Sequence, residues 1–193
     1  ILGKGHASRK LADGQAPPAT QMREPVAVFR GRWHVAYLQM LLNDRRMTEA
    51  YAAVERIALA DDDPALPEAH YLRGLVHETN TRIADPKDPE HGVLLEPSRQ
   101  PWITRHLGDA STWYRRALEA RPSHREARLR LSRVELERGR HARALELLQP
   151  LREEPDATWI RGLAWLFTGA SQAALGAITE AQRAFDRAAQ HPE

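Results

Sequence analysis

The sequence predicts an all-α protein, built as a solenoid of about four antiparallel helix pairs, and three observations indicate this fold class. A spaced pattern of small and large residues recurs along the chain, and prolines and glycines fall between the recurrences. No stretch alternates apolar and polar residues as a half-buried strand would. The chain has 193 residues, of which 42% are hydrophobic and 28% charged, so it is long and apolar enough to bury a sizeable core.

The first helix pair is expected over residues 31–64, behind an N-terminal arm at residues 1–30. The arm has no sustained hydrophobic period and is rich in glycine and proline, which predicts an extended or flexible segment. Within the pair, Leu38 and Ala50 lie twelve residues apart, and Asp44 indicates the turn between the two helices.

The second pair, at residues 67–122, is interrupted. Gly74 and Ala110 lie 36 residues apart, so the usual spacing of twelve leaves 24 extra residues. We place them in an insertion at residues 80–107, whose prolines and glycine predict a long loop.

The last two pairs are expected at residues 125–155 and 162–193, and neither is interrupted. In both, a small residue and an alanine are again twelve residues apart. These residues are Ser132 and Ala144 in the third pair, and Gly169 and Ala181 in the fourth.

This pattern resembles the tetratricopeptide repeat family over about residues 31–193. Ala110 and Ala144 lie 34 residues apart, which is the length of that repeat. The resemblance implies that the small residue and the alanine let two helices approach closely. The large residues four positions after each alanine would then fill the space toward the next pair; they are Val54, Tyr114, Leu148 and Phe185. The chain departs from the family where it favours tyrosine, at His77, Glu135 and Gln172.

The resemblance also implies the function, which is that of a non-catalytic scaffold or adaptor for protein–protein interaction. In this family the first helix of each pair lines a concave groove that binds a partner protein or peptide segment. Arginines in the groove favour an acidic partner, and the groove is polar at one end and apolar at the other. The residues expected to line it are Gln39, Asn43, Tyr71, Leu75, Glu78, Arg130, Arg133, Leu166, Phe167 and Ala170.

Catalytic, cofactor and metal sites are not expected. The chain has no cysteine, which excludes disulfides, thiolate metal sites and cysteine nucleophiles. No serine lies in a nucleophile-elbow motif. His70 and His77 lie seven residues apart at positions that normally pack between helices, and Thr81 stands where a zinc protease motif after His77 needs its second histidine.

Three alternatives stay open. The segment from Arg121 to Arg143 has eight arginines against three glutamates, a formal charge of +5, so RNA binding is a weaker hypothesis. The net charge of the whole chain is only +2, which is small for a dedicated nucleic-acid binder.

The chain begins at Ile1, and it ends directly after the last expected helix. It could therefore be a module of a larger polypeptide, enzymatic or not, or form a homo-oligomer or larger assembly through an uncapped C-terminal helix. No membrane span is predicted. The compartment is left open between the cytoplasm and, if the chain is processed, the periplasm.

Overall fold

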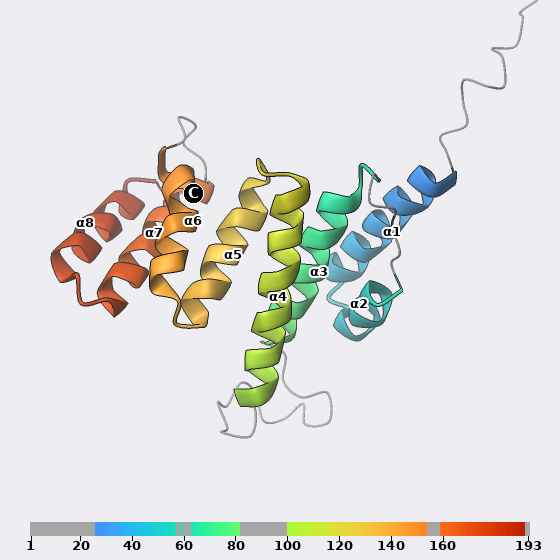
Figure 1. Ribbon diagram of the computed structural model, residues 1–193, viewed down its shortest axis with the longest axis horizontal. Helices are drawn as coiled ribbons and strands as arrows, with labels where there is room; N and C mark the ends of the chain where they lie inside the picture. Colours follow the sequence, from blue (N-terminus) through green and yellow to red (C-terminus); the bar gives the residue numbers. More distant parts are fainter. Residues whose placement is uncertain (1–25, 57–58, 60–62, 82–99, 154–158, 192–193) are drawn as a thin grey trace, which may run out of the picture.

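The protein is all-α, as predicted. The computed structural model describes residues 26–56, 59, 63–81, 100–153 and 159–191, and this part of the chain forms eight helices and no strand (Figure 1). The helices are α1 (Val26–Asn43), α2 (Met47–Val54), α3 (Leu66–Asn80), α4 (Gln100–Ala120), α5 (Arg125–Glu137), α6 (His141–Glu153), α7 (Trp159–Ala174) and α8 (Ile178–Ala189).

The helices stack in chain order. Figure 1 shows them as a row that runs from α1 at one end to α8 at the other. The contacts between α3 and α4, between α5 and α6 and between α7 and α8 define three of the expected pairs, and α1 packs on α2. The first helices of successive pairs also touch, α1 with α3 and α5 with α7. Each pair therefore buries its apolar face against its neighbours, which is the logic of a solenoid.

Glycine and aromatic residues fit together inside two of the pairs, whereas the sequence analysis expected these aromatic residues to fill the space toward the next pair. A Cβ atom on Gly74 of α3 would lie 2.6 Å from the ring of Tyr114 on α4. A Cβ atom on Gly169 of α7 would lie 2.5 Å from the ring of Phe185 on α8. Both distances are far below van der Waals contact, so each ring rests directly on a helix backbone that only glycine leaves bare.

Two predicted boundaries were wrong, because helices begin earlier than expected. Residues 26–30, assigned to the arm, are the first residues of α1, and residues 100–107, assigned to the insertion, are the first turns of α4. Ile103 and Leu107 pack into the core in helical register with Ala110, which explains why the helix extends back to them. The rest of the arm, residues 1–25, and of the insertion, residues 82–99, lies outside the described residues.

The last helix does not present the uncapped apolar face that the sequence analysis expected. Apart from Ile178, the exposed residues of α8 are mostly polar or charged, and its buried residues are Ala181 and Ala184. The exposed side of α8 is therefore mostly polar. Among the described helices, none is long and apolar enough to cross a membrane.

Candidate functional site

The residues predicted to line the groove all lie on the first helices of the pairs, but they differ in how much of each side chain reaches the surface. On α1, the Nε2 atom of Gln39 donates a hydrogen bond to Oδ1 of Asn43 at 3.0 Å. Asn43 is exposed and Gln39 half-buried, so both remain at the surface.

Glu78 on α3 does not reach the surface as predicted, because its side chain is buried and held by hydrogen bonds and ion pairs. The residue is 1% exposed. The hydroxyl of Tyr114 donates to its Oε2 atom at 2.6 Å, and Nη1 of Arg130 on α5 donates to its Oε1 atom at 3.2 Å. Nη1 of Arg133 lies 3.7 Å from the same Oε1 atom. Glu78 thus joins α3, α4 and α5, and it is not available to a partner.

Burial and charge keep this cluster in one protonation state. Burial raises the pKa of Tyr114 well above its usual range, and the neighbouring Glu78 carboxylate raises it further, so the phenol keeps the proton that it donates. Burial lowers the pKa of Arg130, but Glu78 and the nearby tyrosines raise it overall, so the guanidinium stays charged.

Tyr71 and Leu75 also serve the packing more than the surface. The Tyr71 ring is buried, with ring centroids 4.9 Å from His124 and 5.9 Å from Tyr114. Leu75 is half-buried and packs against the main core. Of the residues predicted on α3, none offers a fully exposed side chain to a partner.

The surface that a partner could reach lies on α5 and α7, which touch each other. The side chains of Arg130 and Arg133 on α5 are 33% and 30% exposed. On α7, Leu166 is 43% exposed, and Phe167 and Ala170 are half-buried. The predicted residues thus comprise a basic strip on α5 (Arg130 and Arg133) and an apolar strip on α7 (Leu166, Phe167 and Ala170), while Gln39 and Asn43 lie on α1.

Comparison with known proteins agrees with this architecture. Residues 106–166, which include most of α4, all of α5 and α6 and the start of α7, match a sequence model of the tetratricopeptide repeat family. This segment, about a third of the chain, is therefore similar to tetratricopeptide repeats. A search of curated proteins finds no match to the chain. Tetratricopeptide repeats are in general modules for protein interaction without catalytic activity of their own.

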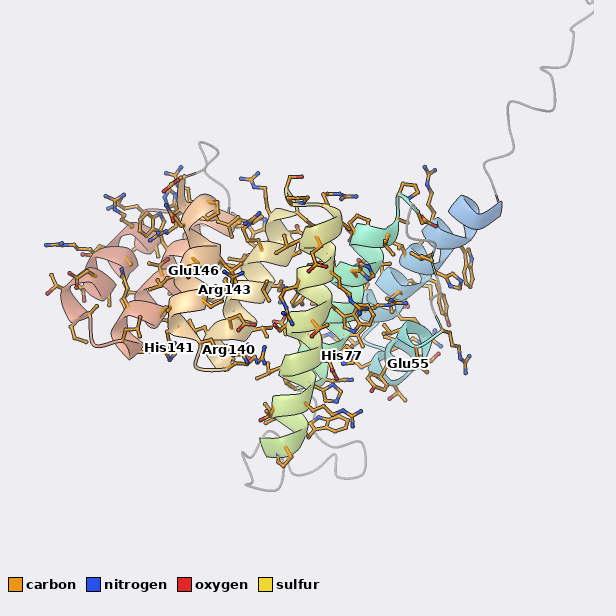
Figure 2. The ribbon with its side chains drawn as sticks, viewed as in Figure 1. Glu55, His77, Arg140, His141, Arg143 and Glu146 are labelled. Atoms are coloured by element: carbon orange, nitrogen blue, oxygen red, sulfur yellow. The ribbon has the colours of Figure 1, made fainter. Side chains whose placement is uncertain are left out.

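The basic segment of these tetratricopeptide repeats is largely paired with carboxylates. Arg138 and Arg140 both donate to the buried carboxylate of Glu135, at 3.1 and 3.4 Å. Arg143 pairs with Glu146 one helical turn further on, and Figure 2 shows these two residues next to each other on α6, with Arg140 nearer the turn between α5 and α6. Glu135 is already counted in the formal charge of +5, but Glu78 and Glu146 lie outside the segment and pair with Arg130 and Arg143. The segment is therefore a weaker attractor of phosphate groups than its arginine count suggests.

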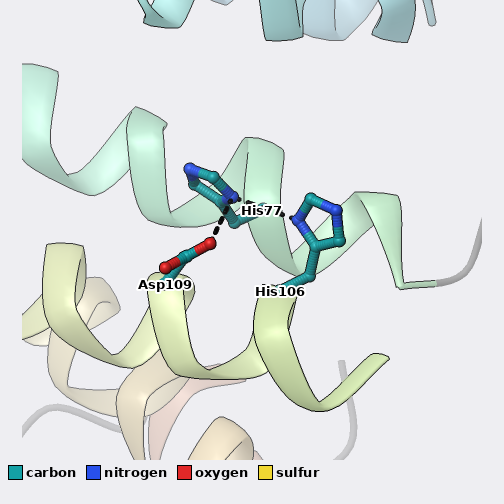
Figure 3. A group of neighbouring side chains, drawn as sticks. All are labelled: His77, His106 and Asp109. Atoms are coloured by element: carbon teal, nitrogen blue, oxygen red, sulfur yellow. Dashed lines mark hydrogen bonds and ion pairs between the residues drawn. The ribbon is translucent and has the colours of Figure 1, made fainter. Parts of the chain in front are cut away.

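One side-chain cluster of the repeats was not predicted. His77 near the end of α3 faces His106 on α4, with their Nδ1 atoms 3.1 Å apart (Figure 3). The Nδ1 atom of His77 also lies 3.8 Å from Oδ2 of Asp109, one turn further along α4. His70, which the sequence analysis placed with His77 at positions that pack between helices, stacks on Trp113 with ring centroids 5.4 Å apart.

Burial keeps these histidines neutral near pH 7. It lowers the pKa of His70 to about 4, with help from the positive charges of Arg73 and Arg116. It also lowers the pKa of His77 and of His106. Sequence reasoning missed the pair of His77 and His106 because 29 residues separate them, and only the packing of α3 on α4 brings them together.

Proposed function

We propose that the chain is a protein-interaction scaffold that binds a segment of a partner protein across the first helices α5 and α7. The observation that carries the proposal is the exposed Leu166 on α7, flanked by the half-buried Phe167 and Ala170, on a helix that contacts α5 with its partly exposed arginines. Apolar side chains left at the surface next to a polar rim are typical of interaction sites.

The chemistry of the two strips supports a particular kind of partner. Apolar side chains of the partner would cover Leu166 and Phe167, gaining roughly 25 cal/mol for each Å² of apolar surface removed from water. A carboxylate of the partner would meet Arg133, whose Nε atom holds Glu137 at 3.0 Å on a partly exposed side of α5. An Asp or Glu next to apolar residues is therefore the expected motif of the bound segment.

The burial of Glu78 decides which substitutions can test the proposal. Reversing the charge of Arg130 would place two carboxylates together at a buried site, so any loss of binding would be confounded with unfolding. Leu166→Glu is better, because the side chain is 43% exposed and its replacement leaves the core intact. Leu175→Glu is a matched control, since Leu175 is 54% exposed in the turn after α7 and undergoes the same chemical change.

The test is selection of binders from a displayed library of random peptides, followed by titration calorimetry with the selected peptides. We expect peptides that combine apolar residues with Asp or Glu. Their affinity should fall at least about tenfold for Leu166→Glu, because a carboxylate would be forced against apolar groups. The affinity should not change for Leu175→Glu. Equal binding by wild type and Leu166→Glu, or equal losses in both variants, would show that α7 is not the binding surface.

A further inference from the structure

The cluster of His77, His106 and Asp109 has the composition of a metal site. It is the one group of three such residues, among those the structure describes, whose ligand atoms all lie within 4.8 Å of one another. We propose that these three side chains bind a divalent transition metal ion of the zinc class between α3 and α4.

The spacing of the three ligand atoms fits such an ion. Zinc bonds of about 2.0–2.1 Å in tetrahedral geometry place neighbouring ligand atoms about 3.3 Å apart. The Nδ1 atoms of His77 and His106 are 3.1 Å apart, and the Nδ1 atom of His77 is 3.8 Å from Oδ2 of Asp109. The two measured distances lie on either side of the required one. The ligand atoms of His106 and Asp109 lie within 4.8 Å of each other. The side chain of Asp109 is 45% exposed, so it can turn to shorten its distances to the two histidines.

The helices hold the ligands on converging faces. His106 and Asp109 are three residues apart, which places them on the same side of α4. His77 faces them from α3, and α3 and α4 pack closely. In Figure 3 the three side chains point toward one another from the two helices. The ligands are therefore positioned by packed helices, which hold a site more rigidly than loops do.

The donor set selects the class of metal. Two imidazole nitrogens with one carboxylate suit zinc and its neighbours, whereas magnesium and calcium prefer sites made of oxygen atoms alone. A metal ion binds the neutral form of an imidazole, whose ring nitrogen offers a lone pair. In the ion-free pair, one Nδ1 atom holds a proton and donates it to the other. On metal binding that proton moves to Nε2 of the same ring, so the imidazoles lose no proton overall.

The surroundings partly shield the site and balance its charge. The Tyr51 ring contacts both imidazoles edge-on, with centroids 5.7 and 5.9 Å away, and Trp102 lies against His106 at 4.0 Å. The negative charge of Glu55 near His77 favours a bound cation. The positive charge of Arg105 near both rings disfavours a bound cation. The exposed side of Asp109 leaves room for water as a fourth ligand.

A bound ion would fasten the end of α3 to the start of α4. His77 lies in the last turn of α3, which ends at Asn80, and α4 begins at Gln100. An ion held by both helices adds its binding free energy to their pairing, so it should raise the melting temperature. At a zinc concentration one hundred times Kd, the expected rise is about 5–10 °C.

The test uses the full chain without a histidine tag, stripped of metal with a chelator. Zn²⁺ is titrated in by calorimetry, and Co²⁺ is titrated separately while its visible absorption reports the coordination geometry. We expect one equivalent of each ion and, for Co²⁺, the intense visible bands of a four-coordinate site. In His106→Ala and in Asp109→Asn the affinity should fall at least about tenfold, because even changing a group that only hydrogen-bonds to a metal ligand costs that much.

His70→Ala is the matched control, because it removes a half-buried histidine of the same helix that lies outside the cluster. This variant should bind like the wild type. Wild-type binding no tighter than that of His106→Ala would overturn the proposal, as would unchanged binding by both ligand variants. If His106→Ala does not fold, Asp109→Asn decides the question, because it changes a partly exposed side chain to one of the same shape.

Discussion

Gly74 is the point at which the packing of a repeat can be tested most directly. In Gly74→Ala the new methyl group would lie 2.6 Å from two carbons of the Tyr114 ring. That ring is fully buried, and its hydroxyl is held by Glu78 at 2.6 Å, so it cannot move aside without weakening that bond. Overpacking of this kind costs about 3 kcal/mol at the upper end of its usual range, while alanine gains about 1 kcal/mol over glycine inside a helix. The net loss is about 2 kcal/mol, which corresponds to roughly 4–8 °C in melting temperature.

Gly108 on α4 supplies the control, because a Cβ atom there meets nothing within 4 Å. Gly108→Ala should therefore stabilise the protein by about 0.5–1 kcal/mol through helix propensity alone. Thermal and urea unfolding, followed by circular dichroism, measure both variants. The reasoning requires changes of opposite sign. If both variants were stabilised equally, the close approach of α3 and α4 at Gly74 would be refuted.

Two further predictions concern buried polar groups. Tyr114→Phe removes the hydroxyl that Glu78 accepts, so the free energy of unfolding should fall by about 1.5–3 kcal/mol in urea titrations; a change below about 0.5 kcal/mol would mean that the bond contributes nothing. Burial holds the pKa of His70 at about 4, whereas the unfolded chain binds that proton near pH 6.5, so stability should fall as the pH drops from about 6.5 to about 4. The His70 ring signals in NMR should titrate near pH 4, and His70→Gln should flatten this part of the stability profile; titration of His70 near pH 6.5 would contradict its burial.

Spacing along the sequence was enough to predict the helix pairs. The separation of twelve residues between a small residue and an alanine depends on contacts inside one pair, and such contacts repeat with the period. Gly74 and Ala110 kept this relation despite the residues inserted between them, although Tyr114, expected to fill the space toward the next pair, packs on Gly74. The insertion boundary was wrong because proline and glycine content was given more weight than helical register. Ile103 and Leu107 already continued the buried stripe of Ala110 and Tyr114.

The side-chain clusters could not be predicted in the same way. The carboxylate of Glu78 meets Tyr114 and Arg130, which follow it by 36 and 52 residues. A periodic pattern places each of these residues on a helix face, but it does not state which polar atoms meet across three helices. Glu78 was therefore assigned to an open groove, although its burial depends on partners that only the stacked structure supplies.

The departures from the family pattern account for much of what is particular to this chain. The family favours tyrosine three residues after the small residue, and a tyrosine there brings a large ring with one polar atom. His77 and Glu135 occupy that position in the second and third pairs, and both are buried. Each needs polar partners inside the stack, because an unpaired buried polar group costs about 1–3 kcal/mol. Both draw a partner from α4, His106 for His77 and Ser111 for Glu135. A position that normally contributes general packing therefore contributes specific polar contacts here, which favours one register of α3 and α5 against α4 over its alternatives.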